Sequence, residues 1–273
     1  MKVSVILTTY NKEDELGRVL EGLALQSTLA HEVIVADDGS GPATKELVSG
    51  FQRDFPCRLL HVWQEDKGFR AAKSRNSALR ESSGDYIVML DGDCLVPRHF
   101  VEDHARLAEK GYFVQGKRVL VAKDAAPLAD SRMVNSPLAL LMAALTGKIS
   151  NSHHILRLPL FFAFRNKKLR GIKTCNFGVY REDAVSVNGF NEEFVGWGRE
   201  DSEFAARLFN YGLMRKEHPF MAICFHLWHE EARREGLRAN EEILQRAISS
   251  GSVRCQSGID QSGPERDRKE RLG

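Results

Sequence analysis

The first third of the chain alternates short apolar runs with stretches of helical periodicity. Buried strands are predicted at residues 3–7, 33–36, 59–62 and 86–90. The intervening segments have apolar residues at helical spacing, most clearly at Leu16, Val19, Leu20 and Leu23, and again over 44–53 and 71–81. Repeated β-α-β units predict an α/β fold with a mainly parallel, Rossmann-like central sheet flanked by helices.

The second half is less regular. Residues 123–173 contain apolar stretches interrupted by three prolines and have no clear period. A strand is predicted at 174–180, a helix from near Glu200, a strand at 221–227, and an amphipathic helix from about 230. From Gly251 the polar composition predicts a disordered tail. We therefore divide the chain at 1–122, 123–230, 231–250 and 251–273.

Composition excludes several classes of protein. Lys and Arg number 39 against 37 Asp and Glu, so overall charge does not indicate a nucleic-acid partner. The longest uncharged apolar runs, 138–145 and 158–164, are shorter than the roughly 20 residues that span a bilayer. Five cysteines without a C-x-x-C spacing fit a reducing compartment. The N-terminal run is typical of a first strand, not a signal peptide, so a cytoplasmic location is expected.

Polar residues follow three of the predicted strands, at 8–11, 37–40 and 91–93. In open α/β sheets, ligands bind outside the carboxyl ends of the strands. These three segments should therefore meet at one edge of the sheet and form a site there.

Asp91-Gly92-Asp93 is the most acidic of these strand ends. In an extended segment the two carboxylates would face opposite sides, so both can serve one site only if the chain turns. One could then bind a divalent ion and the other a ribose hydroxyl, with Gly92 allowing a ligand to approach the backbone. The alternative is an ordinary polar exit from a strand.

Four cations surround the start of the helix at 71–81, namely Lys67, Arg70, Lys73 and Arg75. Such a cluster suits a diphosphate, because the helix N-terminus adds its own positive potential. A solvated basic helix face is the alternative.

The segment 188–203 places Gly196-Trp197-Gly198 shortly before Glu200 and Asp201 at the start of a helix. A tryptophan held by glycines can cover the face of a sugar, and a neighbouring carboxylate can act as a general base. Simple helix capping with a core tryptophan would explain the acids but not the two glycines.

His226 and His229 close the last predicted strand. On a strand, residues three apart face opposite sides, so at most one of them is expected to bind a metal. A structural histidine is the alternative.

The segments 4–11, 33–40 and 90–93 resemble the opening of the family 2 glycosyltransferases with the GT-A fold. The segment 188–203 resembles the acceptor-side motif of β-1,4-galactosyltransferase and polypeptide N-acetylgalactosaminyltransferase-like domains, which also occurs in bacterial chondroitin-type polymerases. The resemblance covers about residues 1–230. It implies a nucleotide-sugar-binding half at 1–122, an acceptor-binding half at 123–230 and a C-terminal helical extension at 231–250.

The resemblance also implies roles for individual residues. Asp93 would bind Mn²⁺ or Mg²⁺ with His229, which the spacing favours over the alternative ligand His226. Asp201 would be the inverting base, with Trp197, Gly198 and Glu200 binding the acceptor. Arg199 departs from the motif, where small residues are common. The donor, a UDP-sugar, would contact Thr8, Tyr10, Asp38, Lys67, Arg75, Asp91 and Gly92, with Asp91 at the ribose.

The implied activity is inverting transfer of a hexose or N-acetylhexosamine to a hydroxyl of a glycan or lipid-linked glycan, in bacterial lipopolysaccharide, capsule or other envelope polysaccharide synthesis. The apolar run at 158–164 and the basic run at 165–173 suggest peripheral docking on the inner face of the plasma membrane, or else a mobile acceptor loop. A metal-dependent nucleotidyltransferase is an alternative, but it would typically show a Gly-rich phosphate loop near the N-terminus. An inactive nucleotide-sugar-binding module is another, weakened by the presence of both carboxylate motifs.

Overall fold

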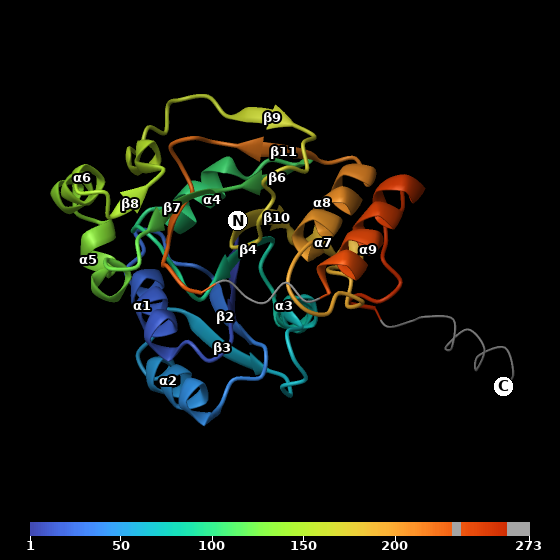
Figure 1. The fold of residues 1–273 in the computed structure, drawn as a ribbon, viewed down its shortest axis with the longest axis horizontal. Helices are drawn as coiled ribbons and strands as arrows, with labels where there is room; N and C mark the ends of the chain where they lie inside the picture. The colour runs from blue at the N-terminus through green and yellow to red at the C-terminus, as the bar shows by residue number, and fades with distance from the viewer. Residues whose placement is uncertain (231–235, 261–273) are drawn as a thin grey trace, which may run out of the picture.

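The computed structural model describes residues 1–230 and 236–260 and contains two sheets, shown in Figure 1. The eight-stranded sheet has the order β3-β2-β1-β4-β10-β6-β11-β9. Its strands are β1 (Val3–Thr9), β2 (Glu32–Asp37), β3 (Arg58–Trp63), β4 (Tyr86–Asp91), β6 (Tyr112–Gln115), β9 (Phe164–Asn166), β10 (Asn176–Tyr180) and β11 (Met214–Glu217). The four-stranded sheet contains β5 (Cys94–Leu95), β12 (Ile223–His226), β7 (Lys117–Val121) and β8 (Ile149–Ser150).

The first four strands of the large sheet are parallel and are joined by helices. The polar strand ends lie level, because Thr8 pairs with Asp91 and Thr9 pairs with Asp37. The predicted α/β class is therefore confirmed, and the three polar segments meet at one edge of the sheet as predicted. The helices are α1 (Glu13–Ala24), α2 (Pro42–Gln52), α3 (Ala71–Glu81), α4 (Phe100–Leu107), α5 (Ser131–Val134), α6 (Pro137–Leu145), α7 (Arg181–Ser186), α8 (Glu200–Asn210) and α9 (Leu237–Ser250).

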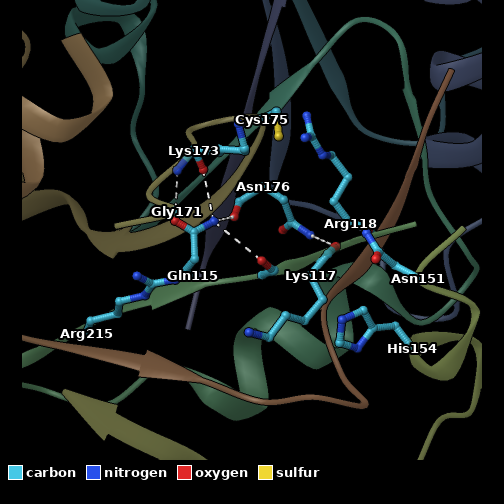
Figure 2. A pocket seen from close by; sticks show the side chains of 11 residues that line it. Gln115, Lys117, Arg118, Asn151, His154, Gly171, Lys173, Cys175, Asn176 and Arg215 are labelled. Atoms are coloured by element: carbon cyan, nitrogen blue, oxygen red, sulfur yellow. Dashed lines mark hydrogen bonds between the residues drawn. The ribbon is translucent and has the colours of Figure 1, made fainter. Parts of the chain in front are cut away.

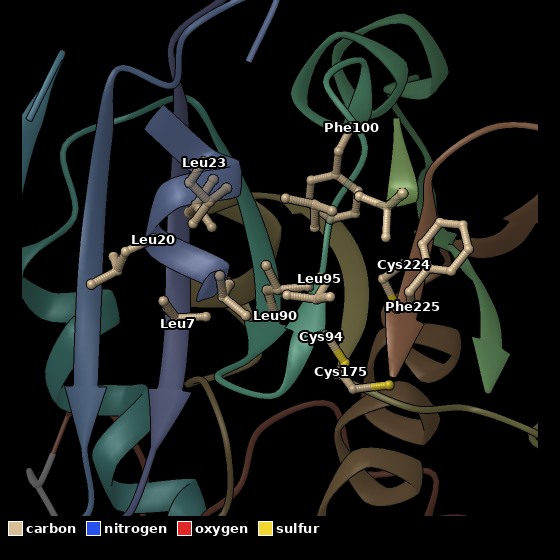
Figure 3. Packing of buried hydrophobic residues seen from close by; sticks show 14 of the residues in the cluster. Leu7, Leu20, Leu23, Leu90, Cys94, Leu95, Phe100, Cys175, Cys224 and Phe225 are labelled. Carbon is tan, nitrogen blue, oxygen red and sulfur yellow. The ribbon is translucent and has the colours of Figure 1, made fainter. Parts of the chain in front are cut away.

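Helix α1 packs against the parallel strands through the predicted apolar stripe. Leu20 and Leu23 lie in the same cluster as Leu7, Leu90 and Leu95, as Figure 3 shows. Full burial of a leucine side chain contributes about 1.5–3 kcal/mol, so this stripe fixes α1 on the sheet. The packing holds the loop between β1 and α1 at the edge where the site lies.

Antiparallel strand β10 pairs with both β4 and β6 and joins the two halves of the chain. The four-stranded sheet was not predicted, because its strands come from distant parts of the sequence. In it β12 is antiparallel to β5, which pairs His226 with Cys94, the neighbour of Asp93. The small sheet therefore brings the end of the chain's last strand to the Asp91-Gly92-Asp93 segment.

Residues 123–173 form short elements, and two of the three prolines in this range lie in the first turn of a helix. Pro137 is the first residue of α6, and the Ser136 hydroxyl accepts a hydrogen bond from the Ala139 N–H. Pro127 lies in the 3-10 helix η1 (Ala126–Leu128), and a second such helix, η2 (Ser152–Ile155), follows β8. Proline is favoured at helix starts because its missing N–H would have no partner there.

The predicted disordered tail is wrong for residues 251–260, which pack on the Asn188-Gly189 turn. The Asn188 side chain donates to the Cys255 carbonyl at 2.9 Å and accepts from the Asp260 N–H at 2.8 Å. A Cβ atom on Gly258 would lie 2.0 Å from the Asn188 carbonyl oxygen. A polar, Gly-containing segment is thus held by hydrogen bonds to Asn188, and Arg80 also donates to the carbonyls of Gly258 and Ile259. The rest of the predicted tail, 261–273, and residues 231–235 of the predicted helix lie outside the described residues.

In the described part of the chain, no helix has the length and apolar character needed to cross a bilayer.

Candidate functional site

The site is organised around the buried guanidinium of Arg75 on α3. The side chain lies 3.4–3.5 Å from three carboxylates and 3.3 Å from a hydroxyl, which belong to Asp91, Glu200, Asp201 and Thr8. The two acidic motifs singled out in the sequence therefore meet at one cation. The sequence placed Arg75 near the donor, but it did not predict this bridging contact to Glu200 and Asp201.

The charges in this cluster perturb one another. Burial alone would lower the pKa of Arg75, but the carboxylates of Asp201, Asp91 and Glu200 raise it above its ordinary value. Burial raises the pKa of Glu200 to about 7, with the Asp201 charge adding to the shift and Arg75 opposing it. Burial is also the main cause that raises the pKa of Asp91. Three acids around one guanidinium leave the site with an excess of carboxylates.

Asp201 is held by Thr174, which precedes β10. The Thr174 N–H donates to one carboxylate oxygen at 3.0 Å, and its hydroxyl donates to the other at 2.5 Å. Both oxygens are thereby oriented while the side chain keeps 23% of its surface exposed. A carboxylate fixed in this way and open to solvent can remove a proton from a bound hydroxyl. Sequence reasoning missed Thr174, whose only signal was its position at the start of a predicted strand.

The turn before α8 has an unusual backbone. Gly196, Gly198 and Arg199 all have φ in the left-handed region, at 78°, 103° and 81°. Glycine adopts this conformation at little cost, whereas Arg199 must be held there. The Arg199 guanidinium lies 2.6 Å from the Glu241 carboxylate on α9, which accounts for the departure from the expected small residue. Trp197 is 38% exposed and so is not a core residue.

A buried ion pair anchors α8 to the preceding turn. Arg207 contacts Glu203 through two hydrogen bonds of 2.8 Å, and it also donates to the carbonyls of Val187 and Gly189. Neither side chain of the pair is exposed by more than 2%. Because α8 begins at Glu200, this anchor sets where Glu200 and Asp201 lie.

Loss of the charge on Glu200 and loss of the charge on Glu203 should change the free energy of unfolding in opposite directions, although the two residues lie one turn apart. In Glu200→Gln the buried charge disappears, so we expect a gain in the free energy of unfolding of at most about 3 kcal/mol above pH 7. The unfolded carboxyl ionises near its ordinary value of 4.5 whereas the folded one holds its proton to about 7. The gain should therefore shrink as pH falls from 7 and vanish below 4.5. Denaturant unfolding at pH 8 and pH 5 measures it.

Glu203→Gln is the matched control, because it leaves the Arg207 charge buried with one partner fewer. We expect a loss of about 3–5 kcal/mol. A Glu200→Gln variant that is less stable than the wild type at pH 8 would contradict the burial argument.

Two of the predicted donor-binding residues, Asp38 and Tyr10, also form hydrogen bonds within the protein. Asp38 is buried, and its carboxylate accepts from the Arg70 N–H at 2.7 Å and from the Gln64 amide at 2.5 Å. Burial raises the pKa of Asp38. Tyr10 is half exposed, and its hydroxyl donates to Asp66 at 2.9 Å. Both side chains thus brace the loop 64–70 beside the strand ends.

The predicted cation cluster is only partly brought together. Lys67 forms an exposed ion pair of 2.7 Å with Glu65. Within residues 1–230 and 236–260, Arg75 is the member of the cluster that contacts the acidic motifs. Lys67 is therefore adequately described as a solvated side chain, whereas Arg70 and Lys73 are only partly exposed.

The chain turns directly after Asp91, as two carboxylates at one site require. The Gly92 N–H donates to the Thr8 carbonyl at 2.7 Å, and a Cβ atom on Gly92 would lie 3.0 Å from the same oxygen. Close packing on β1 therefore favours glycine here. The turn sends Asp93 towards the small sheet.

Asp93, His226 and His229 gather their donor atoms within 4.8 Å of one another. The Nε2 atoms of His226 and His229 lie 3.7 and 3.3 Å from the Asp93 carboxylate. The expectation that only one histidine faces this position is wrong. Strand β12 ends at His226, so the alternation of side chains no longer applies at His229.

This donor set fits a divalent ion such as Mn²⁺. Nδ1 of His229 lies 2.7 Å from the Glu230 carbonyl, which fixes its hydrogen on Nδ1 and leaves Nε2 free to bind. Burial lowers the pKa of His226, which favours the neutral form that ligates metals. The Lys12 ammonium also lies 2.8 Å from Asp93. Burial would raise the pKa of Asp93, but His226 and Lys12 lower it overall.

Comparison with known proteins gives two family matches. Residues 4–175 match the model described as glycosyl transferase family 2, and residues 159–230 match the model described as the N-terminal domain of galactosyltransferase. Validoxylamine A glucosyltransferase of Streptomyces hygroscopicus subsp. limoneus is 30% identical over 227 residues, which is 77% of this chain and 48% of that protein. The chain thus spans about half the length of this curated relative.

Two solved structures show a similar fold. Staphylococcus aureus TarS 1-349 in complex with UDP-GlcNAc superposes with a TM-score of 0.66 at 18% identity, over 92% of this chain and 66% of that one. The mannosyltransferase PcManGT from Pyrobaculum calidifontis, in complex with GDP-Man and Mn²⁺, gives 0.55 at 20% identity, over 92% and 62%. At these identities the similarity establishes the fold.

Proposed function

This chain belongs to glycosyl transferase family 2, and on that premise we propose that it moves a sugar from a UDP-sugar to an acceptor hydroxyl with inversion at the anomeric carbon. The observation that carries the proposal is the Arg75 cluster, where Asp91 of the donor motif and Asp201 of the acceptor motif lie within 3.5 Å of one guanidinium. A donor held at the first and an acceptor held at the second would be adjacent.

The donor would lie over the carboxyl ends of the parallel strands. Thr8 and Asp91 pair in register there, and Asp91 would accept hydrogen bonds from the ribose hydroxyls. Tyr10 is exposed at the same edge and would cover the uracil. Asp38 would act at the uracil end chiefly by holding the loop 64–70, because its oxygens already accept from Gln64 and Arg70.

The acceptor would lie against the start of α8. Asp201 would take the proton of the acceptor hydroxyl as that oxygen forms a bond to the anomeric carbon. The bond from this carbon to the diphosphate breaks on the opposite face, and UDP departs with the electron pair. Glu200 would bind another acceptor hydroxyl, and Trp197 would cover the sugar face.

The Asp93, His226 and His229 cluster would hold Mn²⁺ or Mg²⁺. When bound, such an ion neutralises charge that develops on the departing diphosphate. Lys12 lies 2.8 Å from the same carboxylate and would turn its ammonium to the diphosphate. We place the donor sugar among hexoses and N-acetylhexosamines, and the acceptor among bacterial envelope glycans such as lipopolysaccharide or capsule.

Incubating the protein with a panel of UDP-sugars and Mn²⁺ tests the proposal. We expect UDP release from at least one donor, stimulated by glycan acceptors and lost on chelation. Pyrophosphate release from a nucleoside triphosphate and a sugar phosphate would indicate a nucleotidyltransferase instead. A thermal shift with UDP-sugars that is never accompanied by UDP release would indicate a binding module.

We further propose that an anionic membrane docks on two exposed apolar stretches, α6 and the segment 156–164. Leu138 and Leu145 are 70% and 73% exposed, and Leu160 is fully exposed. Figure 1 shows α6 and the run that leads to β9 in the upper part of the same view. Lys167 and Lys168 are exposed and follow the segment 156–164, so cations that suit anionic lipid headgroups lie next to it in the chain.

Charge reversal at Lys167 and Lys168 should weaken binding to vesicles that contain phosphatidylglycerol. Each cation near such a surface contributes about 1 kcal/mol, so the double Glu variant should bind more than tenfold more weakly in co-sedimentation. Leu145→Glu should act similarly, whereas Leu25→Glu, at an exposed position directly after α1, should not. Binding that is unchanged by charge reversal, or equal on phosphatidylcholine alone, would exclude this docking surface.

A further inference from the structure

A basic cavity lies beside the Asp201 site, where the two sheets meet (Figure 2). It has a volume of about 220 Å³. Its lining includes Lys117, Arg118, Lys173 and Arg215, and it includes neither Asp nor Glu. This volume is below the roughly 300–1,000 Å³ of sites for drug-sized ligands. The cavity suits one small charged group or one sugar residue.

Two of the four cations have no carboxylate partner among the residues that the structure describes. Lys117 and Arg215 both pair with Glu217, the former at 2.7 Å. Arg118 and Lys173, by contrast, have no ion pair with any residue in the described ranges 1–230 and 236–260. Arg118 extends along the cavity towards Cys175, as Figure 2 shows. The cavity therefore presents two cations whose charge is available to a ligand.

Buried amides hold the walls of this cavity in place. The Gln115 side chain accepts from the Lys173 N–H and donates to the Lys173 carbonyl, both at 3.0 Å. The Asn176 amide donates to the Lys117 carbonyl at 2.9 Å. Both amide side chains are buried. The backbone that carries the cations is thus fixed before any ligand binds, which lowers the entropic cost of binding.

The cavity adjoins the reaction centre through the chain itself. Lys173 and Cys175 line it, and the residue between them, Thr174, holds both carboxylate oxygens of Asp201. On the other side, Arg118 pairs in register with Cys224, two residues before His226. A group in the cavity would therefore belong to a molecule whose hydroxyl lies at Asp201.

We propose that this cavity is a subsite for an anionic group, a carboxylate or a phosphate, carried by the acceptor. The inference rests on the proposed function, since it takes Asp201 as the acceptor's base. The donor diphosphate would bind elsewhere, at the cluster around Asp93 and Lys12. Arg118 and Lys173 select acidic acceptors over neutral ones, because an uncharged sugar would leave both cations desolvated and unpaired.

Binding of small probes to the Mn²⁺- and UDP-saturated protein tests the subsite by titration calorimetry. The probes are methyl β-D-glucuronide, glycerol 3-phosphate and the neutral methyl β-D-glucoside. We expect one or both anions to bind and the glucoside to bind at least tenfold more weakly. Binding of only the glucuronide assigns the site to a carboxylate, and binding of only the phosphate ester assigns it to a phosphate.

Arg118→Gln and Lys173→Gln should each weaken binding of the anion about tenfold or more, with UDP affinity unchanged within twofold. Arg170→Gln, exposed in the same basic run but outside the cavity, is the matched control and should bind as the wild type does. Unfolding temperatures confirm that the variants are folded.

Equal binding of the glucoside and the anions would overturn the proposal, as would an equal loss in Arg170→Gln. Loss of UDP affinity in Arg118→Gln would overturn it too, by assigning that cation to the donor. Failure of the proposed function gives a different result, because UDP release would be absent while the anions still bind and still depend on Arg118.

Discussion

Asp201→Asn should lower sugar transfer by about 10²- to 10⁴-fold, the usual contribution of a general base. Asparagine fits the site, because its oxygen can accept from the Thr174 N–H and its amide can donate to the Thr174 hydroxyl, the two groups that hold the carboxylate. Arg75 keeps its contacts with Asp91 and Glu200. UDP-sugar affinity should therefore stay near the wild-type value while turnover is lost.

Turnover from UDP release and UDP-sugar affinity from calorimetry give the two quantities separately. Glu193→Gln is the matched control, because Glu193 lies in the same motif but pairs with Arg246 away from Arg75. Thr174→Val should give an intermediate loss in turnover, since it removes one of the two donors that orient Asp201. Wild-type turnover in Asp201→Asn would remove Asp201 from the base role.

The parallel half of the fold was predictable because its signals are local. The helix predicted at 71–81 has those bounds, and each of the first four strands overlaps its prediction within a few residues. Neighbouring parallel strands end at the same edge of a sheet. The predicted strand ends were therefore enough to place Thr8 near Asp91, without knowledge of long-range contacts. Hydrophobic periodicity and one topological rule were sufficient here.

The contacts within the site were less predictable because they join distant residues. Arg75 is separated from Glu200 by 125 positions, and nothing near either residue indicates the other. The reversal at β10 and the pairing of β12 with β5 likewise depend on tertiary packing. Strand alternation misplaced His226 relative to His229, because it assumed that β12 continues beyond His226. The prediction of disorder from composition was wrong for residues 251–260, which hydrogen-bond to Asn188.

Substitution of the metal cluster should show that both histidines are ligands. Asp93→Asn, His226→Ala and His229→Ala should each weaken Mn²⁺ binding by about 100-fold or more, since loss of an outer-shell partner alone typically costs 10- to 100-fold. The physical reason is that all three donors lie within 4.8 Å, so an ion bound by one can be bound by all. Titration calorimetry with Mn²⁺ in the presence of UDP measures the affinities.

Lys12→Met separates the metal from the other cation at Asp93. Lys12 lies 2.8 Å from the carboxylate and competes with Mn²⁺ for it, so its loss should leave Mn²⁺ affinity unchanged or higher. UDP affinity should fall in the same variant, because an ammonium that would contact the diphosphate is gone. Weaker Mn²⁺ binding in Lys12→Met would contradict this competition. If His226→Ala binds Mn²⁺ as tightly as the wild type does, His229 is the one histidine ligand. His226 is then a partly buried structural neighbour of Asp93.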